Sequence, residues 1–77
     1  MTTFQWQTLC TLIEEELKSK TSANFTVCDI KRRLNIEGDL KSELGEYITE
    51  PYCKYQVKFA YNNKELSFRK KEDNKLN

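Results

Sequence analysis

The sequence predicts a single α+β domain of three helices followed by a two-stranded antiparallel hairpin. Two kinds of apolar pattern support this. Before residue 50, apolar residues recur at helical spacing, whereas after residue 54 they alternate with polar residues as in half-buried strands. Polar and turn-forming residues separate these stretches. We therefore expect the domain to cover residues 1–70 and to be followed by a flexible, charged tail over residues 71–77.

The first predicted helix begins at Thr2 or Thr3, whose hydroxyl can accept a hydrogen bond from a backbone N–H of the first turn. Its broad apolar face is formed by Trp6, Leu9, Cys10, Ile13 and Leu17. A weaker stripe on the other side contains Phe4, Thr8 and Leu12. We expect the core to cover Leu12, and we leave open whether Phe4 is covered or contacts a partner. The pairs Glu14–Lys18 and Glu16–Lys20 have the spacing of ion pairs along a helix.

Two short helices are predicted between residues 26 and 48, with Thr26 capping the first and Asp39 the second. Asn35 and Gly38 supply the turn between them. The apolar positions of the two helices are Val27, Ile30 and Leu34, then Leu40, Leu44, Tyr47 and Ile48. Gly45 in mid-helix costs up to about 1 kcal/mol relative to alanine. It therefore indicates either a bulky group or an internal packing contact close by. Pro51 ends the helical region.

The C-terminal part predicts a β-hairpin with Asn62 and Asn63 as a two-residue turn, because asparagine tolerates positive φ. The register follows from this turn. The expected cross-strand pairs are Tyr61 with Lys64, Phe59 with Leu66 and Val57 with Phe68. This register places the apolar residues on one face. Upstream, we expect Asn24 to Thr26 to be extended, with Phe25 pointing inward.

The two central helices and their turn resemble the helix-turn-helix family. The resemblance is carried by Asp29, Ile30, Arg33, Leu34 and Ile36, which stand where that family commonly has acidic, apolar, basic, apolar and apolar residues. With a helix before the pair and a hairpin after it, the element order resembles the winged helix-turn-helix family over about residues 3–70. The resemblance implies a three-helix winged helix-turn-helix fold, with the two-stranded antiparallel hairpin over 54–70 as its wing. It also implies that the second helix of the pair enters the major groove of DNA.

Composition argues against several classes of protein. The chain has no histidine, and its three cysteines are widely spaced without a CxxC pair, which excludes the usual zinc sites. We expect reduced thiols, with Cys28 in a first helical turn as the one candidate for unusual reactivity. The sequence contains no glycine-rich phosphate loop and no nucleophile paired with acids, so we expect no enzyme, cofactor, metal or small-molecule substrate. Without a long apolar run or an export signal, we expect a cytoplasmic protein that does not associate with membranes.

The resemblance implies binding of double-stranded DNA and a role in transcription regulation, and basic residues suited to contact with phosphates support it. These basic residues lie on the first helix of the pair and along the hairpin. The candidate site also includes Lys41 and Ser42 of the second helix. The candidate nucleic-acid-binding residues are Lys31, Arg32, Arg33, Lys41, Ser42, Lys54, Lys58, Lys64, Arg69 and Lys70.

A second hypothesis is a protein-interaction module that acts on a nucleic-acid machine. The chain has a net charge of only +1, and five acids against one lysine lie between Glu37 and Glu50. That acidic helix is poorly suited to insertion between phosphates and lacks the arginine, asparagine and glutamine side chains that read bases. The candidate partner-binding residues are Glu43, Glu46, Glu50 and Phe4. A homodimer through Phe4 or the hairpin edge is compatible with either hypothesis.

Overall fold

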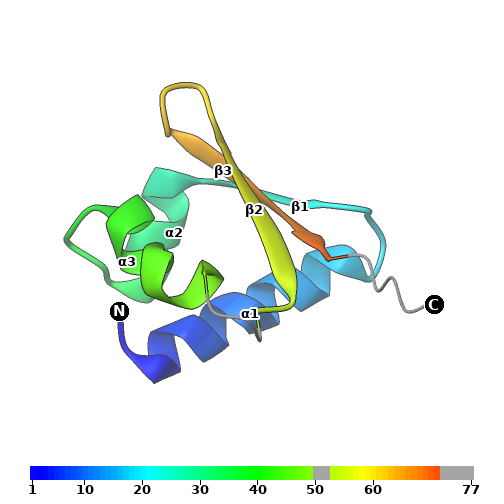
Figure 1. Cartoon of the computed structure of the whole chain (residues 1–77), viewed down its shortest axis with the longest axis horizontal. Helices are drawn as coiled ribbons and strands as arrows, with labels where there is room; N and C mark the ends of the chain where they lie inside the picture. Colours follow the sequence, from blue (N-terminus) through cyan, green and yellow to red (C-terminus); the bar gives the residue numbers. More distant parts are fainter. Residues whose placement is uncertain (50–52, 72–77) are drawn as a thin grey trace.

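The computed structural model of the chain describes residues 1–49 and 53–71 (Figure 1). Over these residues the fold is α+β, with three helices and a three-stranded antiparallel sheet. The elements in chain order are α1 (Thr3–Leu17), β1 (Ala23–Thr26), α2 (Val27–Leu34), α3 (Leu40–Ile48), β2 (Tyr55–Ala60) and β3 (Glu65–Lys70). The predicted helix stop at Pro51 and residues 72–77 of the predicted tail lie outside the described residues. Within the described part, no helix is both long and apolar enough to cross a bilayer.

Each helix begins at a predicted capping residue. Thr2 Oγ1 accepts a hydrogen bond from Gln5 N at 3.1 Å, and the Gln5 side chain in return accepts from Thr2 N at 2.8 Å. This reciprocal pair satisfies two backbone donors that have no partner inside the helix. Thr26 and Asp39 accept in the same way from the backbone three residues ahead, each at 3.1 Å. Asn35 ends α2 with a left-handed φ of 59°.

Two of the three predicted hairpin pairs are confirmed, since Val57 pairs with Phe68 and Phe59 with Leu66, whereas the predicted pair of Tyr61 and Lys64 is wrong because both residues lie in the turn. The hairpin is nevertheless part of a larger sheet. β1 pairs antiparallel with β3, which places Phe25 beside Leu66 and gives the strand order β1-β3-β2. The prediction of a two-stranded sheet is thus too small by one strand. Four residues of β1 carry too short a pattern to identify their partner.

The predicted hairpin turn is wrong in its length. β2 ends at Ala60, so that four residues, and not two, separate the paired strands. Tyr61 shares the left-handed conformation of the two asparagines, with φ of 55° against 57° for Asn62 and 64° for Asn63. The amide of Lys64 donates to the carbonyls of both Ala60 and Tyr61 at 3.1 Å. The predicted turn before α3 forms, with Asn35 in the left-handed conformation and Gly38 in a bend without a positive φ.

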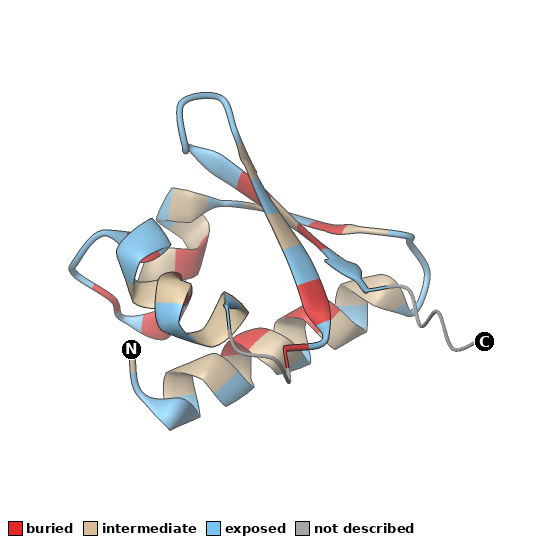
Figure 2. Cartoon of the chain, in the orientation of Figure 1, coloured by how far each residue is buried: buried red, intermediate tan, exposed pale blue. Residues whose placement is uncertain are grey.

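The core lies between the helices and one face of the sheet (Figure 2). Its largest fully buried side chains are Leu9, Ile13, Ile30, Leu40, Leu44, Tyr55, Leu66 and Phe68. Each aliphatic side chain of this size contributes roughly 1.5–3 kcal/mol by leaving water. Phe25 is half-buried and meets Phe68 edge-on, with ring centroids 6.0 Å apart. The predicted inward faces of the helices and strands therefore meet in one core.

Candidate nucleic-acid interface

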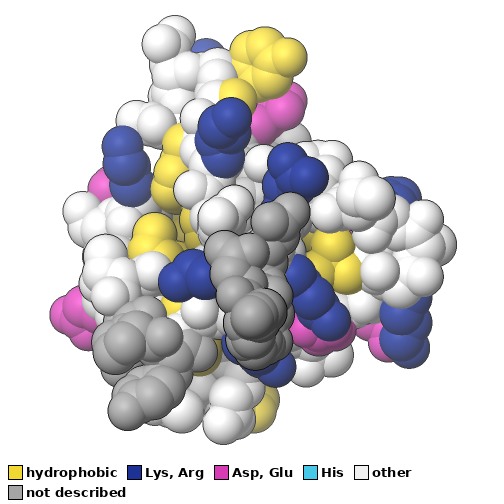
Figure 3. Space-filling view, turned by 45° about the vertical axis from the view of Figure 1, so that its right-hand side comes forward, with side chains coloured by type: hydrophobic (Ala, Val, Ile, Leu, Met, Phe, Trp, Pro, Cys, Tyr) yellow, Lys and Arg dark blue, Asp and Glu magenta, His cyan; other side chains and the backbone are white. Residues whose placement is uncertain are grey.

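The face of the sheet turned away from the helices carries cations that form no ion pair with any acid among residues 1–49 and 53–71. Alternate residues of β2 and β3 point to this side, and a hydrogen bond from Lys71 N to Lys54 O at 2.9 Å continues the strand pairing one step further. We call this surface the outer sheet face, and it consists of Lys54, Gln56, Lys58, Ser67, Arg69 and Lys71. All are exposed except Ser67, which is half-buried. Figure 3 shows one face of the molecule, on which Lys and Arg side chains are more numerous than the Asp and Glu side chains that lie among them.

The four cations of the outer sheet face, Lys54, Lys58, Arg69 and Lys71, lie at neighbouring positions of the paired strands. Gln56 lies opposite Arg69, and Lys58 lies opposite Ser67. Positions two apart on a strand are separated by about 7 Å. Among the described residues, no carboxylate lies within ion-pairing distance of any of these four cations. The amide and hydroxyl groups between them add hydrogen-bonding capacity for phosphate oxygens.

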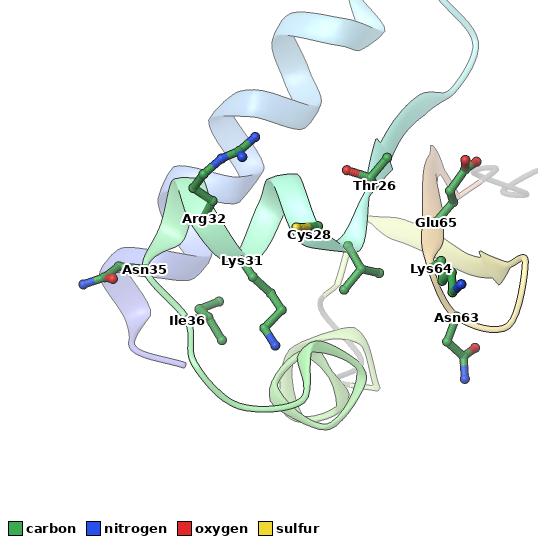
Figure 4. A pocket seen from close by; sticks show the side chains of 10 residues that line it. Thr26, Cys28, Lys31, Arg32, Asn35, Ile36, Asn63, Lys64 and Glu65 are labelled. Carbon is green, nitrogen blue, oxygen red and sulfur yellow. The ribbon is translucent and has the colours of Figure 1, made fainter.

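The basic cluster of α2 is partly neutralised. Asp29 accepts from both arginines, with Arg32 Nη2 and Arg33 Nε each 3.0 Å from a carboxylate oxygen. Lys31 instead points toward a groove of about 820 Å³ between α2 and the hairpin loop (Figure 4). Lys64 lines the other side of this groove, and its carbonyl accepts from Val27 N at 2.8 Å. The structure thus separates Lys31 from Arg33, which the sequence grouped together.

Lys70 has a carboxylate partner on α1. Lys70 Nζ lies 3.4 Å from Glu14 Oε1, on the helix side of the sheet. Glu14 also accepts a hydrogen bond from the Tyr55 hydroxyl, so the predicted pair with Lys18 is wrong. Lys18 pairs with Glu15 at 3.3 Å, whereas the predicted pair of Glu16 and Lys20 forms at 2.7 Å. Lys70 is therefore not part of the outer sheet face.

The Glu14–Tyr55 contact changes the acidity of both groups. Burial, and then the hydrogen bond to Glu14, raise the pKa of Tyr55 well above its ordinary value. The hydrogen bond from Tyr55, followed by the charge of Lys70, lowers the pKa of Glu14. The contact joins α1 to the sheet, and we interpret it as structural.

On α3, several polar groups that could meet DNA are already engaged. The Lys41 ammonium lies over the Phe59 ring, 5.5 Å from its centroid. The Ser42 hydroxyl donates to Asp39 Oδ2 at 2.9 Å, and the hydrogen bonds from Ser42 lower the pKa of Asp39. Of the predicted acidic contacts, Glu43 accepts from the N-terminal amine of Met1.

The remaining acidic positions of the α3 region are less constrained. Glu46 is exposed, while Glu50 lies outside the described residues. A β-carbon at Gly45 would meet no atom of the described residues within 4 Å, so the expected close neighbour is absent there. The glycine is thus not explained by packing.

The remaining candidate residues have apolar or thiol side chains. Phe4 is 76% exposed and Tyr61 in the hairpin loop is 73% exposed. Cys28 is exposed in the groove, whereas Cys53 is buried. The part of the chain that the structure describes contains no group of three His, Cys, Asp or Glu side chains able to hold a metal.

Sequence reasoning missed the full extent of the outer sheet face. It selected the cations Lys54, Lys58 and Arg69 but not the polar residues between them, Gln56 and Ser67. The alternation that predicted the buried side of the hairpin also identifies these residues as its opposite side. Tyr61 was expected to pair in the strand, and no local pattern indicated that it lies in the loop.

Comparison of the chain with protein-family models, with curated proteins and with solved structures gives no match. Function must therefore be inferred from the arrangement of this chain's own side chains.

Proposed function

We propose that the chain is a winged helix-turn-helix protein of the cytoplasm that binds double-stranded DNA through its phosphates, in a regulatory role. The element order supports the scaffold, because two short helices joined by a tight turn follow a first helix and precede a β-hairpin. The loop of the hairpin extends beyond the helices (Figure 1), as expected of a wing. Because one fold serves many functions, the binding site is inferred from the side chains of this chain.

The outer sheet face carries the functional proposal. Lys54, Lys58, Arg69 and Lys71 lie on one open surface and have no carboxylate within 4 Å among the described residues. Cations that are not neutralised internally release counterions from DNA when they contact phosphates. Glu65 is the one acid on these two strands, and it lies at the loop end opposite Ala60. The surface therefore suits a polyanion laid across the hairpin.

The geometry of α3 supports backbone contact over base reading. Lys41, Ser42 and Glu43 each have an intramolecular contact, and the exposed Glu46 would repel phosphates. Bidentate contacts to guanine or adenine need arginine, asparagine or glutamine, and α3 has none of these. We therefore expect weak dependence of binding on DNA sequence.

Fluorescence anisotropy with a labelled blunt duplex tests this proposal. With four phosphates neutralised, the logarithm of the binding constant should fall with the logarithm of salt concentration with a slope of about −3 to −4. Lys58→Glu with Arg69→Glu should weaken binding roughly tenfold or more and reduce this slope. The matched control is Lys18→Glu with Lys20→Glu, which makes the same change in net charge at exposed positions near the end of α1.

Two results of this assay would contradict the proposal. One is that the wild-type chain fails to bind the duplex at low salt. The other is that both double variants weaken binding equally, since net charge alone would then explain the effect. Circular dichroism establishes that both variants keep the fold.

The protein-contact alternative is supported by Phe4. Its ring is exposed at the start of α1, beside a hollow lined by Thr8, Arg33 and Leu34. The exposed ring offers apolar surface for contact with another protein or with a second copy of the chain. The acidic residues of α3 give less support, because Glu43 already pairs with the N-terminal amine. If the wild-type chain binds no duplex at low salt, a contact through Phe4 is the function to pursue.

A further inference from the structure

The loop between β2 and β3 carries an aromatic ring that the fold does not use. Tyr61 is 73% exposed, and it is one of two large apolar side chains in this state among the described residues. Its hydroxyl makes no hydrogen bond within the described part of the chain. The loop lies at the far end of the hairpin (Figure 1), and its last residue, Lys64, bonds through its carbonyl to Val27 N at the start of α2. The ring therefore contributes little to the core.

The backbone at this position is unfavourable for tyrosine. Three consecutive residues, Tyr61, Asn62 and Asn63, have φ between 55° and 64°. Asparagine enters this left-handed region readily, whereas a residue with a large side chain does so at a cost. Glycine or asparagine would suit residue 61 better, so the local structure gives no reason for an aromatic residue. An exposed ring held at such a conformation is a reason to look for a ligand.

The surroundings of Tyr61 indicate which ligand. Asn62 and Asn63 are exposed and carry amide groups that can bond to the edges of bases. Lys64 is the next residue of the loop. Lys58 is the residue of the outer sheet face on β2 that lies nearest to the loop. A stacking surface, amides and cations thus occur together at one end of the hairpin. This combination is typical of surfaces that bind unpaired nucleotides.

We propose that Tyr61 stacks on an unpaired nucleobase at the junction of a duplex with a single strand. This inference rests on the proposed function, because the outer sheet face would hold the phosphates of the adjoining duplex. Inside a duplex each base is paired and covered by its neighbours, so a base with both a free face and a free pairing edge is available only in a single-stranded segment. The preferred ligand is thus a duplex with a single-stranded overhang.

The test compares a labelled blunt duplex with the same duplex extended by a short overhang, at equal salt concentration. The wild-type chain should bind the overhang DNA roughly tenfold more tightly, which corresponds to the stacking of one base. Tyr61→Phe keeps the ring and should keep this preference. Tyr61→Asn removes the ring, suits the left-handed backbone and should bind both DNAs with the affinity for the blunt duplex. Because it relieves an unfavourable φ, Tyr61→Asn should also raise the melting temperature.

The outcomes separate this inference from the proposed function. If Tyr61→Asn keeps the wild-type preference for the overhang, or if the wild-type chain has no such preference while binding the blunt duplex, the stacking role of Tyr61 is wrong and duplex binding stands. If the wild-type chain binds neither DNA, both proposals fail. A change in self-association of Tyr61→Asn without a change in DNA binding would assign the ring to a protein contact and overturn the inference.

Discussion

At the scale of single residues, the contact between Tyr55 and Glu14 joins the first helix to the sheet. The Tyr55 side chain is buried, with its hydroxyl bonded to the Glu14 carboxylate. The same carboxylate pairs with Lys70 from β3. Three elements therefore meet at one carboxylate. The ion pair between Glu14 and Lys70 adds little to the free energy of unfolding, because water reaches Glu14 and exposed ion pairs contribute little.

Removing the Tyr55 hydroxyl should affect both stability and its dependence on pH. We expect Tyr55→Phe to lower the free energy of unfolding by about 1 kcal/mol at pH 7. The pKa of Glu14 is lowered in the folded chain from its ordinary value of 4.5. Its stabilising effect is therefore complete above that value and is lost as the pH falls through the lowered pKa. Tyr55→Phe should lose less stability than the wild type over this acidic range.

Urea unfolding at pH 7 and at pH 2–3 measures this difference. Glu15→Gln is the control, since it removes an exposed carboxylate from the same helix and should leave the contact with Tyr55 intact. Equal losses of stability on acidification in the wild type and in Tyr55→Phe would show that the contact does not contribute.

The same contact illustrates the limit of sequence reasoning for individual side chains. Spacing along α1 predicted that Glu14 pairs with Lys18, four residues ahead. Its actual partners, Tyr55 and Lys70, come from strands far away in the sequence. Local spacing cannot rank such partners, because their distance depends on how the whole chain folds. The pair of Glu16 and Lys20 was predictable because the two residues are four apart in the sequence, at the end of α1 and just beyond it.

At the scale of elements, α3 contains a glycine that packing does not require. A β-carbon at Gly45 meets no described atom within 4 Å. Alanine restricts the unfolded chain more than glycine and favours the helix. Gly45→Ala should therefore raise the free energy of unfolding by up to about 1 kcal/mol, which urea denaturation measures. A loss of stability would contradict this account and indicate a close contact at Gly45.

Elements that depend on nearby residues were predictable, and those that depend on remote pairing were not. The caps Thr2, Thr26 and Asp39 each act within three residues, and all three form. The hairpin register follows from one turn and from alternation over six residues. In contrast, β1 reaches β3 across some forty residues of chain, and its four residues fit several partners. The pairing of β1 with β3 could therefore not be predicted from the sequence and is known only from the structure.

At the scale of the whole molecule, the fold distributes charges that almost cancel in the sequence. The net charge is only +1, with 13 basic and 12 acidic side chains. Ion pairs with acids hold several cations on or near the helices, including Arg32, Arg33 and Lys70. Cations of the outer sheet face remain without such partners in the described part of the chain. A nearly neutral protein can in this way present a basic surface.

The sequence located most of these cations but could not divide them into surfaces. It placed basic residues on the hairpin, and alternation could separate Arg69 from Lys70 once the strand was assigned. It could not show that Asp29 occupies both Arg32 and Arg33, or that α3 uses Glu43 internally. Those contacts depend on side-chain geometry in the folded chain. They favour the cations of the sheet over those of the two central helices as the candidate DNA contact.

A two-dimensional ¹H–¹⁵N NMR titration of the chain with a blunt DNA duplex at low salt tests the central claim most directly. If the outer sheet face binds phosphates, the backbone amide signals of Lys58, Ser67 and Arg69 should shift progressively, and those of residues 40–48 in α3 should change little. The largest shifts in α3, or no shift anywhere, would contradict the account.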